Sequence, residues 1–165
     1  MFFLIIIIFE LLIINIMKLY PFNYQSFGYY LSQRESSGNY KAQNLIAYGK
    51  YQFTIPTLNR LMGESGIDYI DTNNFLNSPI IQDTYFVLYV RDIIKEIISL
   101  NLTKYIGQSI DGQTINIYGL VGGAWLGGVG GLQNYLNNHL QTPDYLGTNI
   151  SDYIKLFSSY KISNI

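Results

Sequence analysis

The segment from Gly122 to Gly131 constrains the fold more than any other part of this 165-residue chain, because six of its ten residues are glycine. A glycine inside a helix costs about 1 kcal/mol relative to alanine. This density of glycine indicates a backbone that another group approaches closely, with the Trp125 side chain adjacent as a surface for contact. Two interpretations stay open: a ligand lies against this backbone, or one helix packs tightly against another.

The rest of the chain predicts helices joined by short polar loops, with a small β element. The predicted helices are Tyr24–Glu35, Thr54–Gly63, Pro79–Leu100, Val129–Asn138 and Ser151–Tyr160, while Tyr40–Phe53 is a loop or short hairpin and Gly107–Gln113 is a turn. Gly38 can take the left-handed conformation that ends the first helix. The fold class is therefore mainly α, in the α+β sense.

Pro79–Leu100 is the clearest helix, because Ser78 can cap it and proline is favoured at a first helical position. Apolar and long side chains recur along it at steps of three and four residues, which predicts one buried stripe. That stripe consists of Ile80, Thr84, Val87, Leu88, Arg91, Ile94 and Ile98.

Composition excludes several classes of protein. The chain has a net charge of −1 and no cluster of Lys or Arg, which argues against binding to nucleic acid. It contains no cysteine, so disulfides, thiolate chemistry and cysteine-bound zinc are ruled out. Its single histidine, His139, is expected to be a solvated residue at a helix end. The length fits one domain with a proper core.

Residues 1–17 are almost entirely apolar apart from Glu10 and one Asn. The segment is short for a membrane span, and it lacks the basic start and small-residue cleavage site of a signal peptide. Three interpretations stay open: an uncleaved anchor or signal, a helix within the fold, or a true start of translation at Met17. The domain itself is assigned to residues 18–165.

Two further motifs carry polar chemistry. Arg34-Glu35-Ser36-Ser37-Gly38 places a carboxyl group at the end of a predicted helix, where it faces the negative end of the helix dipole. If aromatic side chains also shield Glu35, both effects favour the protonated acid that cleavage of a glycosidic bond requires. Alternatively, Glu35 is a solvated surface residue.

The second motif is Gly49-Lys50-Tyr51-Gln52. The neutral amide of Gln52 can bind a sugar hydroxyl or acetamide, and Tyr48 and Tyr51 can stack on sugar rings. Alternatively, the segment is an ordinary hairpin with a buried tyrosine.

Taken in order, Glu35-Ser36, Gly49-Lys50-Tyr51-Gln52 and Ala124-Trp125-Leu126-Gly127-Gly128 resemble the three motifs of soluble lytic transglycosylases and goose-type lysozymes. The resemblance covers roughly residues 31–135, and its nearest form is that of compact phage and bacterial lysozyme-like proteins. It implies a lysozyme-like helical fold with two lobes, a small β-hairpin and a substrate groove.

The resemblance also implies roles for single residues. Glu35 matches the catalytic acid/base, Ser36 matches the residue that supports it, and Gln52 matches an amide that lines the groove. Trp125, Gly127 and Gly128 then belong to the substrate-binding set, with Trp125 at a position where the family has Tyr. Leu126 departs from the family, which has Asn there, and this removes a polar contact near the cleaved sugar.

The implied activity is cleavage of peptidoglycan by a lytic transglycosylase at the bond between N-acetylmuramic acid and N-acetylglucosamine. It needs one Glu and neither metal nor cofactor, and it places the protein at the cell wall as an exported, membrane-anchored or virion-associated enzyme.

Three alternatives stay open. The first is hydrolysis of peptidoglycan or chitin, which needs a second carboxylate. The candidates for it are Glu64, Asp68, Asp71 and Asp83, each expected to be a loop or cap residue. The second is a non-catalytic glycan-binding or virion structural module. The third is a membrane-interacting protein that depends on residues 1–17. The sequence makes no prediction of oligomeric state.

Overall fold

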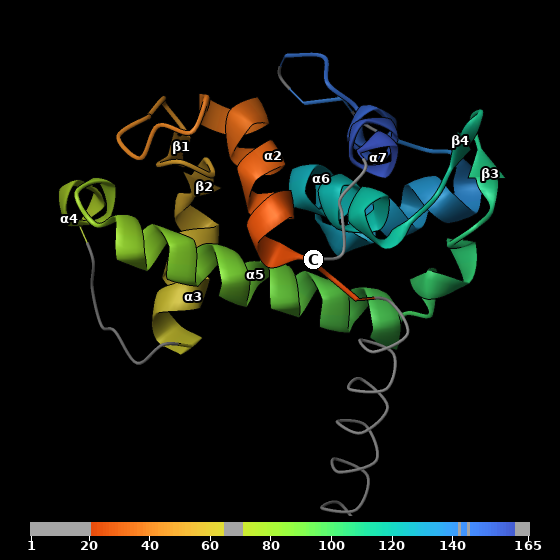
Figure 1. Cartoon of the computed structure of the whole chain (residues 1–165), viewed down its shortest axis with the longest axis horizontal. Coiled ribbons are helices and arrows are strands. Elements are labelled where there is room, and N and C mark those ends of the chain that lie inside the picture. The colour runs from red at the N-terminus through yellow and green to blue at the C-terminus, as the bar shows by residue number, and fades with distance from the viewer. Residues whose placement is uncertain (1–20, 65–70, 142, 145, 161–165) are drawn as a thin grey trace, which may run out of the picture. The chain divides into compact units, whose positions relative to one another are not determined.

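The computed structural model describes residues 21–64, 71–141, 143–144 and 146–160 (Figure 1). These residues form a mainly helical α+β structure with two small antiparallel sheets, as predicted. The chain divides into two compact units, and the boundary falls inside one long helix between Arg91 and Asp92. The apolar segment 1–17 lies outside the described residues. Within the described part of the chain, no helix is both long and apolar enough to cross a membrane.

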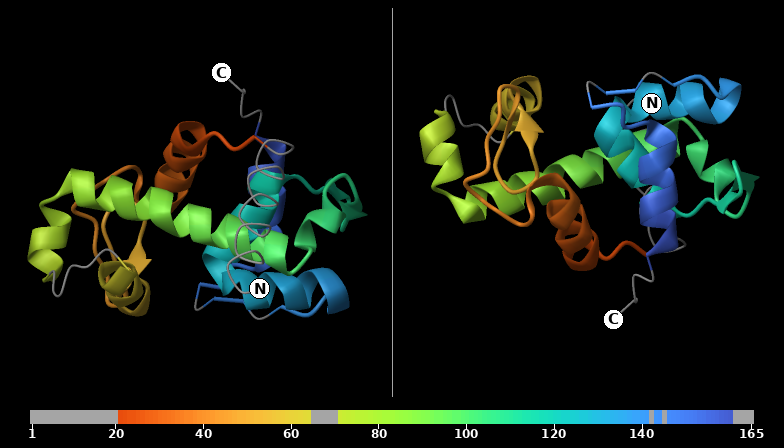
Figure 2. Two further views of the ribbon diagram at one scale, coloured as in Figure 1. Left: turned by 90° about the horizontal axis from the view of Figure 1, so that it is seen from below. Right: turned by 90° about the horizontal axis from the view of Figure 1, so that it is seen from above.

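The first unit begins at Tyr24 and ends at Arg91. Its elements are α2 (Tyr24–Ser36), β1 (Ala47–Tyr48), β2 (Phe53–Thr54), α3 (Ile55–Glu64), α4 (Thr72–Leu76) and the first part of α5 (Pro79–Ser99). The strands β1 and β2 pair antiparallel, with Tyr48 opposite Phe53, and α3 follows β2 directly (Figure 2). The predicted helices, the hairpin and the start of α5 at Pro79 are confirmed.

Aromatic rings from four segments build the core of the first unit. The Phe86 ring on α5 lies 4.4 Å from the Tyr51 ring and 6.2 Å from the Phe27 ring of α2, measured between centroids. Phe53 on β2 lies 6.0 Å from Phe75 on α4. Burying each ring contributes about 1.5–3 kcal/mol. This core fixes the hairpin and the first turn of α2 against α5.

The face of α5 that packs inward differs from the predicted stripe. Ile80 is 80% exposed, Val87 is 41% exposed and Thr84 is also exposed, whereas Ile94 and Ile98 are buried as expected. The helix buries Gln82, Tyr85, Phe86, Val90, Ile93, Ile94, Ile97 and Ile98. Because α5 carries apolar side chains on more than one side, periodicity alone did not select the correct face.

The second unit contains the remainder of α5 and the C-terminal elements. These elements are the 3-10 helix η1 (Leu102–Tyr105), β3 (Ser109–Ile110), β4 (Gln113–Thr114), α6 (Ile117–Asn138) and α7 (Ile150–Ser159). The turn predicted at Gly107–Gln113 is part of a β-hairpin whose two strands are joined by two residues, Asp111 and Gly112. Their φ angles are 51° and 78°. Two consecutive positive φ angles with an Asp-Gly sequence are typical of a type I′ turn.

Several glycines of α6 are explained by its neighbour α7, which lies against it in Figures 1 and 2. A Cβ atom on Gly122 would collide with the Phe157 ring, and one on Gly127 would collide with Ile150. Gly128 has a φ of 70° and a ψ of 164°, so it interrupts α6 directly before Val129, where the sequence predicted a helix to begin. Of the two interpretations offered for the glycine segment, tight helix packing accounts for Gly122 and Gly127.

This packing predicts opposite effects for two alanine substitutions in α6. Gly122→Ala is expected to lower the free energy of unfolding by about 1–3 kcal/mol, because its methyl group enters the space of Phe157, which is 0% exposed. Gly130→Ala meets no atom within 4 Å and is expected to raise stability by up to about 1 kcal/mol. Urea denaturation of both variants measures the difference. Equal stabilities would contradict the packing explanation.

Candidate functional site

Glu35 lies half-buried in the last turn of α2. The helix ends because Ser37 and Gly38 take left-handed backbone conformations, with φ angles of 56° and 76°. The Gly38 N–H donates to the Ser32 carbonyl at 3.0 Å, which satisfies one carbonyl of the final turn. The predicted helix end at Gly38 is confirmed, and it fixes the position of the Glu35 backbone.

Ser36 connects the Glu35 motif to the Gly49–Gln52 motif. Its hydroxyl donates to the Lys50 carbonyl at 2.6 Å and accepts from the Asn39 N–H at 3.1 Å. The residue that follows Glu35 is therefore tied to the centre of the second motif, 14 positions along the chain. The first two motifs thus form one local structure.

The turn from Gly49 to Gln52 is held by its own side chains. Gly49 has a φ of 79°, and a Cβ atom there would collide with the Gln82 side chain, so glycine is required on both grounds. Gln52 also has a positive φ, of 53°, and its amide donates to the Gly49 carbonyl at 2.9 Å. The side-chain amide of Asn44 donates to the side-chain oxygen of Gln52 at 2.9 Å. The Gln52 side chain therefore braces the hairpin with one N–H and one acceptor lone pair left for other partners.

Gln82 supports this turn from α5, a role that no sequence motif indicated. Its side chain is 0% exposed and bonds three backbone groups. The side-chain oxygen accepts from the Lys50 N–H at 2.8 Å, and the amide donates to the carbonyls of Tyr40 and Phe75, both at 2.9 Å. The backbone of Lys50 is thus held by Gln82 at its N–H and by Ser36 at its carbonyl.

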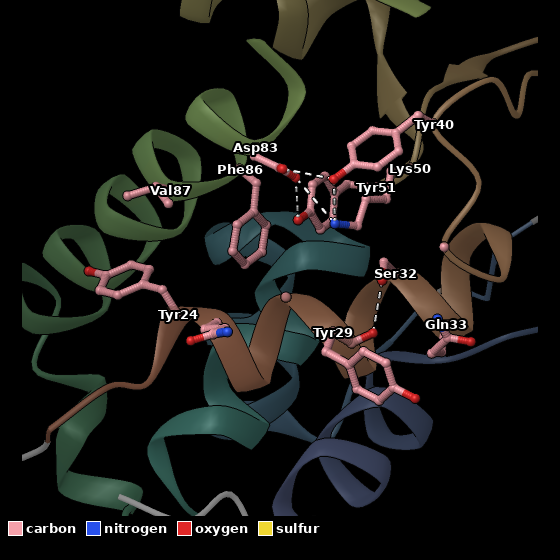
Figure 3. A pocket seen from close by; sticks show the side chains of 13 residues that line it. Tyr24, Tyr29, Ser32, Gln33, Tyr40, Lys50, Tyr51, Asp83, Phe86 and Val87 are labelled. Atoms are coloured by element: carbon pink, nitrogen blue, oxygen red, sulfur yellow. Dashed lines mark hydrogen bonds and ion pairs between the residues drawn. The ribbon is translucent and has the colours of Figure 1, made fainter. Parts of the chain in front are cut away.

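Asp83, the next residue on α5, accepts hydrogen bonds from several side chains (Figure 3). One carboxylate oxygen accepts from the Tyr51 hydroxyl at 2.8 Å and from the Lys50 ammonium at 3.2 Å. The other oxygen accepts from the Tyr40 hydroxyl at 2.8 Å, and Lys50 also donates to Tyr40 at 2.9 Å. Asp83 was expected to be a loop or cap residue, and this expectation is wrong because the carboxylate is the centre of a polar cluster on a helix.

The charges in this cluster are fixed by its neighbours. Burial lowers the pKa of the Lys50 ammonium, but hydrogen bonds to Tyr40 and Tyr51 and the charge of Asp83 outweigh it and raise that pKa above its usual range. Burial, together with the hydrogen bond to Asp83, raises the pKa of Tyr51. At neutral pH the cluster therefore contains a charged Lys50 and a neutral Tyr51 that donates to Asp83.

The two tyrosines predicted to stack on sugars differ in their placement. Tyr48 is half-buried on β1. Tyr51 is only 3% exposed, and its ring stacks on Phe86 at an interplanar angle of 15°. The expectation that Tyr51 offers a ring face to a sugar is wrong, because that ring belongs to the packed core.

The third motif lies on α6 in the second unit, whereas Glu35, Ser36 and Gln52 lie in the first. Trp125 and Leu126 are half-buried, Gly127 packs on Ile150, and Gly128 forms the break in the helix. The groove implied by the resemblance stays a prediction.

The remaining candidates for acid, base or ligand roles have simpler surroundings. Asp71 caps α4 by accepting from the Asn74 N–H at 2.7 Å, as expected of a cap residue. Glu64 is the last residue of α3, and Asp68 lies outside the described residues. His139 is exposed at the C-terminal end of α6, which confirms the prediction for it. Among the residues that the structure describes, no three acidic or histidine side chains are grouped closely enough to hold a metal ion.

The structure defines a mainly helical α+β protein with a polar cluster and a half-buried carboxyl group at a helix end. Comparisons with protein-family models, with curated proteins and with solved structures found no match to this chain. The motifs and their geometry are therefore the basis for any assignment of function.

Proposed function

We propose that this protein cleaves peptidoglycan glycan strands as a lytic transglycosylase, with Glu35 as its acid and base. The observation that carries the proposal is the 2.6 Å bond from the Ser36 hydroxyl to the Lys50 carbonyl, which joins the Glu35 helix end to the Gly49–Gln52 turn. In the family that the motifs resemble, these two segments supply the acid and a groove amide. If the two motifs matched the family only by chance, there would be no reason for them to be hydrogen-bonded to each other. Their contact therefore supports the proposal.

In the proposed reaction, the Glu35 carboxyl group donates its proton to the glycosidic oxygen between N-acetylmuramic acid and N-acetylglucosamine as that bond breaks. The acetamide of the muramic acid assists at the carbon left behind. The Glu35 carboxylate then removes the proton of the 6-hydroxyl of the same sugar, whose oxygen bonds to that carbon. The products are a 1,6-anhydro end and a new free chain end, and no water is consumed.

The surroundings of the other carboxylates favour this mechanism over hydrolysis. A hydrolase of this type needs a second carboxylate to position water or to act as nucleophile. Asp83 accepts three hydrogen bonds from Lys50, Tyr40 and Tyr51, and Asp71 is committed to its helix cap. Two of the four candidates for a second carboxylate thus have structural roles in this protein.

The test is digestion of purified peptidoglycan by the full-length protein, with the products identified by mass spectrometry. Anhydro-muropeptides, lighter by one water than the reducing products of a lysozyme, are the expected result. Reducing-end products would replace the proposal with hydrolysis by the same fold. No products from a protein shown to be folded by circular dichroism would favour a non-catalytic glycan-binding module, for which Leu126 at the family's Asn position is the supporting feature.

A further inference from the structure

A pocket lies in the first unit, between α2 and the start of α5, and the Lys50–Tyr51 segment closes one end of it (Figure 3). Its volume is about 580 Å³, which is within the range of about 300–1,000 Å³ usual for pockets that bind small ligands. Glu35 and Gln52, both in the described part of the chain, do not line it. The pocket is therefore lined by neither Glu35 nor Gln52, although Lys50 and Tyr51 of the Gly49–Gln52 turn form part of its wall.

The polar end of this pocket exposes a carboxylate and shields an ammonium group. The side chain of Asp83 is 47% exposed, whereas that of Lys50 is 19% exposed and lies 3.2 Å from Asp83. An anionic ligand would meet the carboxylate first and would be repelled. A cation would gain little from Asp83, because Lys50 at 3.2 Å already neutralises the carboxylate, and a zwitterion would have to break this ion pair. The charges thus favour an uncharged ligand that donates one hydroxyl to the remaining acceptor position of Asp83.

The other walls combine aromatic rings with amides. Tyr29 is 60% exposed on α2, and Tyr24 and Phe86 also line the pocket. Gln25 and Gln33 are exposed on the same helix and can both donate and accept hydrogen bonds. An aromatic face beside several polar groups suits a pyranose ring, which has apolar C–H faces and a rim of hydroxyls.

We propose that this pocket binds one or two uncharged pyranose rings, as a saccharide site separate from Glu35. The ring stacks on Tyr29, one of its hydroxyls donates to the acceptor position that Asp83 has left, and Gln33 bonds a second polar substituent. Such a site would hold a glycan on the protein whether or not Glu35 cleaves it. The proposal therefore stands independently of the proposed activity.

The experiment is a titration of the ¹⁵N-labelled full-length protein with N,N′-diacetylchitobiose, followed by NMR. We expect saturable shifts at the amides of Gly28, Gly38 and Lys50, which surround the pocket. Tyr29→Ala is expected to raise the dissociation constant about tenfold through the loss of stacking. Gln33→Ala is expected to raise it about threefold to tenfold through the loss of a hydrogen bond.

Leu45→Ala is the matched control, because Leu45 is 98% exposed and does not line the pocket. Its dissociation constant should stay within about twofold of the wild-type value. Shifts centred on Asn44 and Gln52, or affinities that Tyr29→Ala leaves unchanged, would overturn the proposal. So would binding of the zwitterionic dipeptide D-Ala-D-Ala in this pocket without binding of the disaccharide. Because the readout is binding, its failure is distinguishable from failure of the peptidoglycan digestion.

Discussion

Replacing Glu35 with glutamine is expected to lower the rate of glycan-strand cleavage by about a thousandfold. Glutamine keeps the shape of the side chain but has no acidic proton to give to the leaving oxygen and cannot take one back. General acid–base catalysis of this kind typically contributes about 10²- to 10⁴-fold to a rate. Release of soluble muropeptides from purified peptidoglycan, measured over time for both proteins, gives the ratio of rates.

The control for this variant is Glu96→Gln, which makes the same chemical change at an exposed position on α5. We expect Glu96→Gln to retain full activity, and both variants to unfold near the wild-type temperature. If Glu35→Gln keeps more than about a tenth of the wild-type rate, the rate has fallen by less than about tenfold. This is smaller than the loss of about 10²-fold or more that is usual for an acid–base residue. Glu35 would then not be the acid, and the proposed mechanism would fail.

The ends of the helices could be predicted because local chemistry determines them. Pro79 begins α5 since proline is favoured at a first helical position, and Gly38 follows the end of α2 since it tolerates a positive φ. The interruption of α6 at Gly128 is of the same kind. Each signal lies within a few residues of the feature that it predicts, so no knowledge of distant contacts was needed.

The partners of the candidate site could not be predicted, because they depend on which face of α5 turns inward. The predicted stripe included Ile80 and Val87, which are exposed, and the true face carries Gln82. Once that face is known, Gln82 and Asp83 come within hydrogen-bonding distance of Lys50, 32 and 33 positions away in the chain. Gln82 is followed by Asp83 and Thr84, so the local sequence does not distinguish it from an exposed polar residue.

The second large effect is expected for Gln82→Leu, which should lower the free energy of unfolding by about 3 kcal/mol. Leucine has a similar volume, so the main change is the loss of three hydrogen bonds to the backbone of Lys50, Tyr40 and Phe75. A buried backbone group left without its partner costs about 1–3 kcal/mol. Urea denaturation followed by circular dichroism measures the loss. We also expect the folded variant to cleave more slowly, because Gln82 holds the Lys50 N–H and Ser36 contacts the carbonyl of the same residue.

Gln108→Leu is the matched control, because the Gln108 side chain also donates to a backbone carbonyl, that of Lys104, but is exposed. Water can replace the lost partner there, and the change in stability should stay within about 0.5 kcal/mol. If Gln82→Leu is no more destabilising than Gln108→Leu, the three buried bonds do not hold the turn. A third outcome is that Gln82→Leu loses stability but, while folded, cleaves at the wild-type rate. Gln82 would then hold the turn, but the geometry of the turn would not affect catalysis by Glu35. That result would remove the structural link between the two motifs on which the proposed function depends.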